Sequence, residues 1–221
     1  MEIKVLKNVM IKNNSIGADN RAFFREKAVL AVNLVSSPGA GKTTLLESTI
    51  DKMRSKYKVA VIEGDLYTSR DAERLEKFNI QIVQINTEGG CHLDARMVSG
   101  AIKEINIDDV DVLFIENVGN LVCPASFDLG EAKRILIYSI AEGADKPQKY
   151  STMFKTADVV LINKVDLSTA CRVDVDHVEK EIRSINDKAL VLRTTAVDPH
   201  SLREWMMWLE GEIERSKKSK D

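Results

Sequence analysis

Residues 36–44, SSPGAGKTT, combine the glycines, lysine and threonine that bind phosphate groups. They match the phosphate-loop pattern G-x-x-x-x-G-K-[ST], except that Ser36 stands at the first glycine position. Two glycines remain free to adopt the positive φ angles that turn backbone N–H groups inward, and a helix starting near Lys42 would point its positive end at the phosphates. Lys42 is predicted to bridge the terminal phosphates, and Thr43 to bind Mg²⁺. The predicted nucleotide contacts in this loop are Gly39, Ala40, Gly41, Lys42, Thr43 and Thr44.

A second motif, NKVD at residues 163–166, follows the apolar run VVLI. The Asp166 carboxylate can accept two hydrogen bonds, from N1–H and the 2-amino group of guanine, whereas adenine offers no such pair. A polar surface turn has a similar composition, but this motif follows a phosphate loop and lies at the end of an expected strand. We therefore predict that Asn163, Lys164 and Asp166 select GTP over ATP.

Acidic residues at two further strand ends are candidates for the chemistry of hydrolysis. Asp65, in EGDL, is predicted to bind Mg²⁺ or to position the attacking water. Glu116 begins ENVG, where a GTPase usually has D-x-x-G, and Gly119 can present its N–H to the γ-phosphate. Asn120 follows instead of a water-orienting glutamine, and no internal arginine finger is evident, so slow intrinsic hydrolysis is predicted. The predicted catalytic set is Lys42, Asp65, Glu116 and Gly119.

Two of the three cysteines lie in loops beside these motifs. Cys91 and His92 stand in GGCHLDA, and Cys123 follows Gly119 in ENVGNLVCPA. We expect Cys91 at the amino end of a helix that runs to about residue 104, where the helix dipole would lower the thiol pKa and favour a metal-binding thiolate. Small buried hydrophobic cysteines are the alternative. Cys171 lies before a polar helical stretch and is interpreted as structural.

The elements that must position these motifs follow from the hydrophobic pattern. Most of the apolar runs are separated by charged stretches with helical periodicity, which predicts an α/β fold. We expect a mostly parallel sheet with helices on both faces, in a single domain of residues 1–221. A helical lead-in is expected at 1–28, a last helix at 201–215 and a frayed tail at 216–221. The expected strands are 29–35, 59–63, 80–85, 112–116, 134–141, 159–163 and 189–193.

The composition excludes several classes of protein. The 221 residues are 44% hydrophobic and 30% charged with a formal net charge of -2, so general nucleic-acid binding is not expected. No apolar run approaches the roughly 20 residues that span a bilayer, and the first residues lack the apolar segment of a signal peptide. A cytoplasmic protein without a membrane partner is expected. Three cysteines do not suggest a disulfide framework.

Taken together, SSPGAGKTT, EGDLYTSRDAERL, ENVGN and NKVD resemble the P-loop GTPases (three-layer α/β/α) that mature nickel enzymes and dimerise around their nucleotides. The resemblance covers nearly the whole chain from Val29, and it implies base contacts from Thr195 and Ala196. GGCHLDA, ENVGNLVCPA and EGADKPQKY narrow it to the HypB family of hydrogenase nickel-incorporation GTPases. That resemblance implies that Cys91, His92 and Cys123 are ligands of Ni²⁺, with Zn²⁺ able to occupy the same site.

The resemblance also implies partners. Three ligands leave a four-coordinate site open, so a water or a second copy must complete it, and a GTP-dependent homodimer sharing the metal is expected. A nickel chaperone and the precursor of the hydrogenase large subunit are the implied protein partners. Asp71 and Lys149 are candidates for contacts across the dimer, with unpartnered surface charges as the alternative. Because Cys123 shares a loop with Gly119, GTP is expected to change the metal geometry.

Two other functions remain open at this stage. A urease-type nickel GTPase would carry a Cys-Pro-His triplet, which is absent from this sequence. A signalling or assembly GTPase without metal would have buried cysteines and a protein partner as its output. Residues 1–30 contain no Cys or His, so neither a terminal nickel site nor nickel storage is expected.

Overall fold

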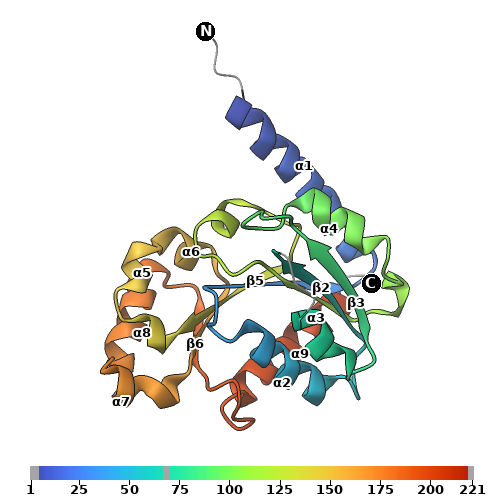
Figure 1. Cartoon of the computed structure of the whole chain (residues 1–221). Helices are drawn as coiled ribbons and strands as arrows, with labels where there is room; N and C mark the ends of the chain where they lie inside the picture. Colours follow the sequence, from blue (N-terminus) through green and yellow to red (C-terminus); the bar gives the residue numbers. More distant parts are fainter. Residues whose placement is uncertain (1–4, 67–69, 219–221) are drawn as a thin grey trace.

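Seven strands form one parallel sheet in the order β3-β2-β4-β1-β5-β6-β7 (Figure 1). The structure is a computed structural model that describes residues 5–66 and 70–218. All six strand pairs in this part of the chain are parallel, which confirms the expected sheet. The strands are β1 Leu30–Ser36, β2 Val59–Asp65, β3 Gln81–Asn86, β4 Val112–Glu116, β5 Lys133–Ser139, β6 Val159–Asn163 and β7 Leu190–Arg193.

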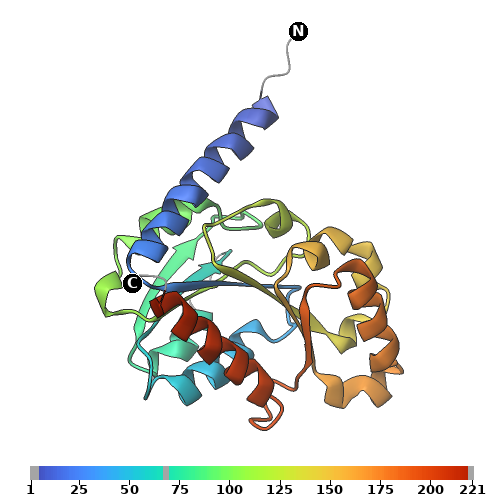
Figure 2. The ribbon, with the colours of Figure 1, turned by 180° about the vertical axis from the view of Figure 1, so that it is seen from behind.

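Helices cover both faces of this sheet because each parallel connection must cross over it (Figures 1 and 2). Helices α2, α3 and α9 pack on one face, and α1, α4, α6 and α8 pack on the other. The helices are α1 Val5–Glu26, α2 Lys42–Met53, α3 Arg70–Glu76, α4 Ala95–Ile102, α5 Lys146–Lys149, α6 Ser151–Thr156, α7 Ser168–Cys171, α8 Val175–Ile185 and α9 Arg203–Lys218. Short 3-10 turns lie at Ile107–Asp109, Cys123–Ser126, Ile140–Glu142 and Val165–Leu167.

The central strands are buried on both faces, which is why they read as continuous apolar runs. In β1, Val32 and Leu34 pack toward α2 and α9, whereas Ala31 packs toward α1 and α4. On α9, Trp205 is fully buried, and its indole N–H donates to the Thr49 hydroxyl of α2 at 2.9 Å. Because the strands are parallel, the carboxyl ends of β1, β2, β4 and β6 lie at the same end of the sheet. The sequence motifs follow these strand ends.

The expected strand at 134–141 ends earlier than predicted. β5 stops at Ser139, whose hydroxyl accepts a hydrogen bond from the Ala141 N–H at 3.3 Å. Glu142 in turn accepts from the Ser139 N–H at 3.1 Å. This reciprocal capping box turns residues 140–142 into a 3-10 turn.

The two terminal helices also differ slightly from their predicted bounds. The lead-in predicted at residues 1–28 is helical over residues 5–26, and residues 1–4 lie outside the described part of the chain. The tail was predicted to fray from residue 216, but α9 continues to Lys218. Basic residues in the last helical turn complement the helix dipole, and Lys217 pairs with Asp111 at 2.8 Å. Residues 219–221 lie outside the described part of the chain.

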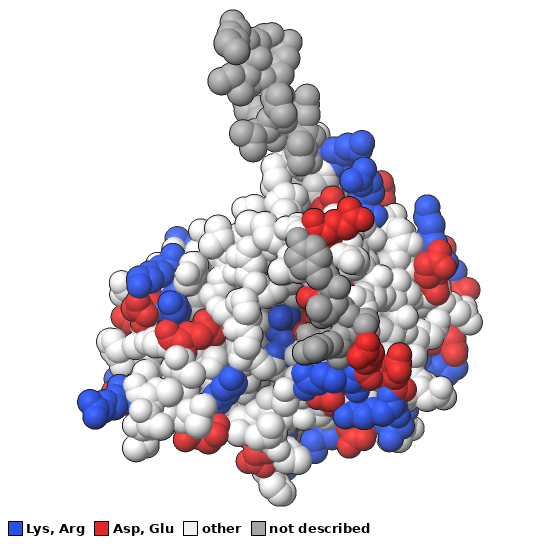
Figure 3. Space-filling view, viewed as in Figure 1, with Lys and Arg blue, Asp and Glu red and all other residues white. Residues whose placement is uncertain are grey.

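Charged side chains of both signs are interspersed on the face shown in Figure 3. This distribution agrees with the formal net charge of -2. Among the described residues, no helix is both long and apolar enough to cross a membrane.

Candidate functional site

The phosphate loop connects β1 to α2 and has the backbone that its glycines permit. Gly39 has φ 73° and Gly41 has φ 105°, both in the region that favours glycine. Ser36, in contrast, is the buried last residue of β1 and pairs with Ile137 of β5. Its hydroxyl donates to the Ser37 carbonyl at 2.6 Å. A serine fits at the first glycine position because the chain there is still a regular strand.

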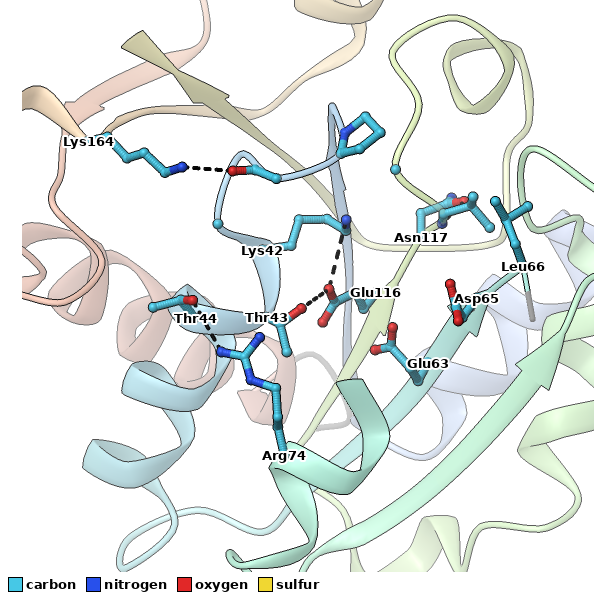
Figure 4. Close-up of a pocket in the computed structure, with 16 residues that line it drawn as sticks. Lys42, Thr43, Thr44, Glu63, Asp65, Leu66, Arg74, Glu116, Asn117 and Lys164 are labelled. Atoms are coloured by element: carbon cyan, nitrogen blue, oxygen red, sulfur yellow. Dashed lines mark hydrogen bonds and ion pairs between the residues drawn. The ribbon is translucent and has the colours of Figure 1, made fainter. Parts of the chain in front are cut away.

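Lys42 and Thr43 both approach the buried carboxylate of Glu116 (Figure 4). The Thr43 hydroxyl donates to Glu116 Oε1 at 2.8 Å, and Lys42 Nζ lies 3.8 Å from the same oxygen. Glu116 is 1% exposed and ends β4, next to β1 in the sheet. The carboxylate therefore holds the two phosphate-loop side chains at the start of α2.

A cavity of about 410 Å³ lies above these residues. Glu63 of β2 pairs in register with Glu116 of β4, so two acidic side chains from neighbouring strands reach the same cavity, and Asp65 lies further along its wall (Figure 4). A hydroxyl and carboxylate oxygens are the hard donors that Mg²⁺ prefers. The residues present thus fit a magnesium ion. The cavity is lined by Pro38, Gly39, Gly41, Lys42, Thr43, Thr44, Glu63, Gly64, Asp65, Leu66, Arg74, Glu116, Asn117, Val118, Gly119 and Lys164.

The NKVD segment lies against the phosphate loop. The Asn163 side-chain amide donates to the Ala40 carbonyl at 2.8 Å, and its oxygen accepts from the Ala196 N–H at 3.0 Å. Lys164, with φ 60°, donates to the Gly39 carbonyl at 2.8 Å. The structure therefore brings together three segments that the sequence analysis assigned to one nucleotide.

The fourth NKVD residue is placed differently. Asp166 is exposed, and its carboxylate accepts a hydrogen bond from the Thr195 hydroxyl at 3.0 Å. Asn163 is thus occupied by contacts within the protein, whereas Asp166 has acceptor capacity left for a ligand. Guanine recognition by Asp166 stays a prediction. The hydrogen bond from Thr195 fixes the orientation of the Asp166 carboxylate.

Cys91, His92 and Cys123 form a compact cluster next to this site. Their potential ligand atoms all lie within 4.8 Å of one another. The two cysteine sulfurs are 2.9 Å apart, and Cys91 Sγ is 3.5 Å from His92 Nδ1. Cys91 is exposed, and the other two residues are half-buried. Thiolate and imidazole groups in such a cluster suit Ni²⁺ or Zn²⁺.

The expected electrostatics of Cys91 were wrong. Helix α4 begins only at Ala95, and the Asp94 side chain caps it by accepting from the Met97 N–H. The helix end is thus occupied by a carboxylate, and the neighbouring Cys123 sulfur, with burial, raises the pKa of the Cys91 thiol. Burial lowers the pKa of His92, which keeps its imidazole neutral and able to bind a metal.

Two asparagines of the loop after β4 contact the loop of Cys91 and His92, and one of them, Asn117, also lines the nucleotide cavity. The buried Asn117 oxygen accepts from the backbone N–H groups of Leu93, at 3.1 Å, and of Val118, at 3.0 Å. The Asn120 side chain donates to the Cys91 carbonyl at 3.3 Å. Sequence reasoning noted Asn120 only as a missing glutamine and assigned no role to Asn117. The signal was weak, because both roles depend on contacts with a loop distant in the sequence.

Other site residues were also missed. Arg74 of α3 reaches the cavity and donates to the Thr44 hydroxyl at 3.2 Å. Glu63 was quoted only as part of a motif. The Phe127 ring lies on His92, with ring centroids 3.9 Å apart. An exposed arginine and a loop phenylalanine have no distinguishing pattern in a single sequence.

Two further predicted residues, Lys149 and Cys171, are not brought into this site. Lys149 is exposed and pairs with Asp145, the residue before its own helix, so its role at a dimer contact stays a prediction. Cys171 is half-buried at the end of α7. The side chain of Asp71 lies outside the described residues.

Comparison with known proteins places the chain in a family. The family described as CobW/HypB/UreG, nucleotide-binding domain, matches residues 30–193. Hydrogenase maturation factor HypB of Azotobacter chroococcum mcd 1 is 45% identical over 208 residues, which are 94% of this chain and 68% of that protein. The crystal structure of HypB from Archaeoglobus fulgidus superimposes with a TM-score of 0.87 at 36% identity, covering 92% of this chain and 99% of that one.

A second solved structure, of HypB from Helicobacter pylori in complex with nickel, has a TM-score of 0.88 and 38% identity over 93% of this chain and 97% of that chain. The parallel sheet and the phosphate loop define a P-loop nucleotide-binding domain of the CobW/HypB/UreG class. Within that class, the chain belongs to the HypB family of hydrogenase maturation factors. The family resemblance noted in the sequence is confirmed.

Replacing Lys42 with Ala should abolish nucleotide binding. The variant removes the one lysine that the phosphate loop directs into the cavity, and a hydrogen bond to a charged group contributes about 1.5–3 kcal/mol, before the electrostatic attraction of the phosphates is added. Calorimetric titration should show at least about a hundred-fold loss of affinity. Lys52→Ala, at an exposed position of the same helix, serves as the control. Retained affinity in Lys42→Ala would remove this loop from the site.

Proposed function

We propose that this protein is a GTP-hydrolysing metallochaperone that delivers nickel during maturation of nickel–iron hydrogenase. One observation carries the proposal: Cys91, His92 and Cys123 lie in the two loops that adjoin the nucleotide cavity, and their potential ligand atoms are within 4.8 Å of one another. Asn117 lines that cavity and also contacts the loop of Cys91 and His92. Membership of the HypB family and the nickel complex of the Helicobacter pylori relative support the choice of cargo.

GTP is the nucleotide that the site favours. Asp166 is exposed, two residues after Lys164, which contacts the phosphate loop. Thr195 orients the Asp166 carboxylate, which suits the two donors on the guanine edge. The Ala196 N–H, held by Asn163, places the last loop beside it. Thr43, Glu116 and Asp65 would hold Mg²⁺, which neutralises developing phosphate charge when bound. Asn120 stands where many GTPases have a glutamine that orients the attacking water, and its amide donates to the Cys91 carbonyl instead. Slow intrinsic hydrolysis is therefore expected.

Replacing Asp166 with Asn should reduce GTP affinity by at least about ten-fold, because hydrogen bonds to a charged acceptor contribute about 1.5–3 kcal/mol and about 1.4 kcal/mol is ten-fold. Competition between GTP, xanthosine triphosphate and ATP measures the change in selectivity. Asp187→Asn, at an exposed position before β7 and so at the opposite edge of the sheet, is the control. Unchanged preference for guanine in Asp166→Asn would contradict this assignment.

The metal cluster offers three ligands and needs more. Cys91 is exposed, so its sulfur is accessible to a second molecule. Val122, next to Cys123, is 61% exposed and gives the same surface an apolar contact. We propose that two copies meet here in the presence of GTP and complete the coordination of Ni²⁺ or Zn²⁺ between them. Asp71 and Lys149 are proposed to contribute contacts across this homodimer.

The double variant Cys91→Ala, Cys123→Ala should lose nickel binding, because a single imidazole holds the ion far more weakly than two thiolates and an imidazole. Loss of partners behind the ligands already changes affinity by about 10–100-fold, so loss of two ligands should lower the nickel affinity measured by calorimetry by at least about a hundred-fold. Cys171→Ala retains the cluster and provides the matched control. If the double variant binds nickel as tightly as the natural protein, the proposed metal site is wrong.

The two sites are proposed to communicate through the loop after β4. A side chain at Gly119 would come within 3.0 Å of Pro38 in the phosphate loop, so the two backbones lie in close contact. On that loop, Asn117 and Asn120 contact the loop of Cys91 and His92, and Cys123 belongs to the metal cluster itself. A γ-phosphate that moves Gly119 would therefore shift Cys123 relative to Cys91. GTP can change nickel affinity only through such a difference between two states.

Nickel affinity and dimerisation should differ between the GDP-bound protein and the protein with a non-hydrolysable GTP analogue. Coupling free energies between two sites are usually about 1–3 kcal/mol, which corresponds to roughly 5–150-fold. Nickel titration and light scattering on the same samples measure both quantities. Equal affinity and equal dimerisation in the two nucleotide states would leave the proposed coupling without support.

The nickel would pass from this protein to the precursor of the hydrogenase large subunit, either directly or through a nickel chaperone that receives it first. A nickel-transfer assay to candidate acceptors, with and without GTP, tests this transfer.

A metal-independent assembly GTPase is the alternative function. The exposed Cys91 beside Cys123 argues against it, because such a protein would be expected to have buried, separate thiols. Delivery to another nickel enzyme, such as urease, is separated by the choice of acceptor in the same assay.

A further inference from the structure

Three residues on one face of α1, Asn13, Gly17 and Asn20, are buried against the loops that carry the metal cluster. Their spacing of four and three residues places them on the same side of a helix. α1 leaves the body of the molecule, and its carboxyl-terminal half runs beside α4 (Figures 1 and 2). It lies outside residues 30–193, which match the nucleotide-binding domain of the family.

The first contact of this face is with the loop of Cys91 and His92. The Ala95 N–H donates to the Asn13 side chain at 2.9 Å, and the Asn20 side chain donates to the Ala95 carbonyl at 2.9 Å. Ala95 begins α4, where backbone N–H groups lack partners within the helix. The side chains of Asn13 and Asn20 thus bind the N–H and the carbonyl of Ala95, the residue at which the loop of Cys91 and His92 meets α4.

The second contact is with the segment that carries Cys123. The Asn13 amide donates to the Asp128 carbonyl at 2.9 Å, and the Asn20 amide donates to the Leu129 carbonyl at 3.0 Å. Phe127, whose ring lies 3.9 Å from that of His92, immediately precedes these residues. Each of the two asparagines therefore bridges the same two segments.

Glycines allow the helix to come this close. A Cβ atom at Gly17 would lie 2.9 Å from the Asp128 carbonyl oxygen. A Cβ atom at Gly130, which has φ +91°, would lie 2.6 Å from the Gly17 carbonyl oxygen. Arg21 adds an ion pair with Asp128 at 2.6 Å. The backbone of α1 therefore packs directly against the backbone of the loop after Cys123, and the buried amides of Asn13 and Asn20 have hydrogen-bond partners.

We propose that α1 is a clamp that fixes the Cys91–His92 loop and the Cys123 segment at one separation, and so sets the geometry of the metal cluster. Asn13 and Asn20 are positioning residues, since neither belongs to the cluster itself. The inference rests on the metal-binding role proposed above. Partners behind metal ligands usually change affinity by about 10–100-fold when they are removed, because they orient the ligands.

Asn13→Leu and Asn20→Leu each test the clamp, because leucine fills the volume but cannot bridge the two segments. We expect each variant to bind nickel at least about ten-fold more weakly and to show an altered thiolate-to-nickel charge-transfer absorption. GTP affinity should stay unchanged. Asn14→Leu, at an exposed position of the same helix, is the matched control. The absorption band reports ligand geometry, which a general loss of stability would not alter in the folded protein.

Gly17→Ala keeps both asparagines and improves helix propensity, so it tests the clamp even if the leucine variants fold poorly. Its methyl group should separate α1 from Asp128 and weaken nickel binding in the same direction. Unchanged nickel affinity and absorption in the folded Asn13, Asn20 and Gly17 variants would overturn the clamp alone. An equal loss of nickel and GTP affinity would also overturn it, as a general stability effect. If Cys91→Ala binds nickel like the natural protein, the metal site and the clamp both fail.

Discussion

The parallel pairing of β1 with β4 at the centre of the sheet is the constraint on which the site depends. It aligns Leu34 with Glu116, so the phosphate loop and the ENVG segment leave the sheet side by side. β2 pairs with the other side of β4 and aligns Glu63 with Glu116. Three loops distant in the sequence thereby converge on one cavity. The two faces of these strands pack against different helices, so a one-residue shift would bring each side chain against the wrong set of packing partners.

The fold and the loops of the site could be predicted from the sequence, because both depend on local patterns. Apolar runs of strand length located the sheet, and the phosphate loop and NKVD are contiguous motifs whose spacing carries their meaning. The roles of Asn117 and Asn120 could not be predicted, because each depends on a backbone group in another loop. The pKa of Cys91 was predicted in the wrong direction, since only coordinates place Cys123 beside it and show that Asp94 already caps α4.

Buried amide side chains join the loops throughout this edge of the molecule. Asn117 connects the cavity to Leu93, and its amide also approaches Asn33 inside the sheet, at 3.4 Å. Asn13 and Asn20 connect α1 to the start of α4 and to the segment that follows Cys123. A neutral amide can donate and accept at once, so it links two backbones without the desolvation cost of a buried charge. Satisfied networks of this kind give loops one defined arrangement.

Asn163 and Asp166 belong to one motif but differ in their surroundings: Asn163 holds loops together, and Asp166 is the residue proposed to select the base. Asn163 joins Ala40 to Ala196, so the loops that surround a nucleotide are assembled during folding and not at the moment of binding. Little conformational entropy then remains to be lost when the ligand arrives. Asp166 stands outside this bracing and is exposed. With the role proposed for Asp166, a substitution at the aspartate would change base preference while the loop assembly stays intact, whereas a change at the asparagine would disturb the loops around phosphate and base together.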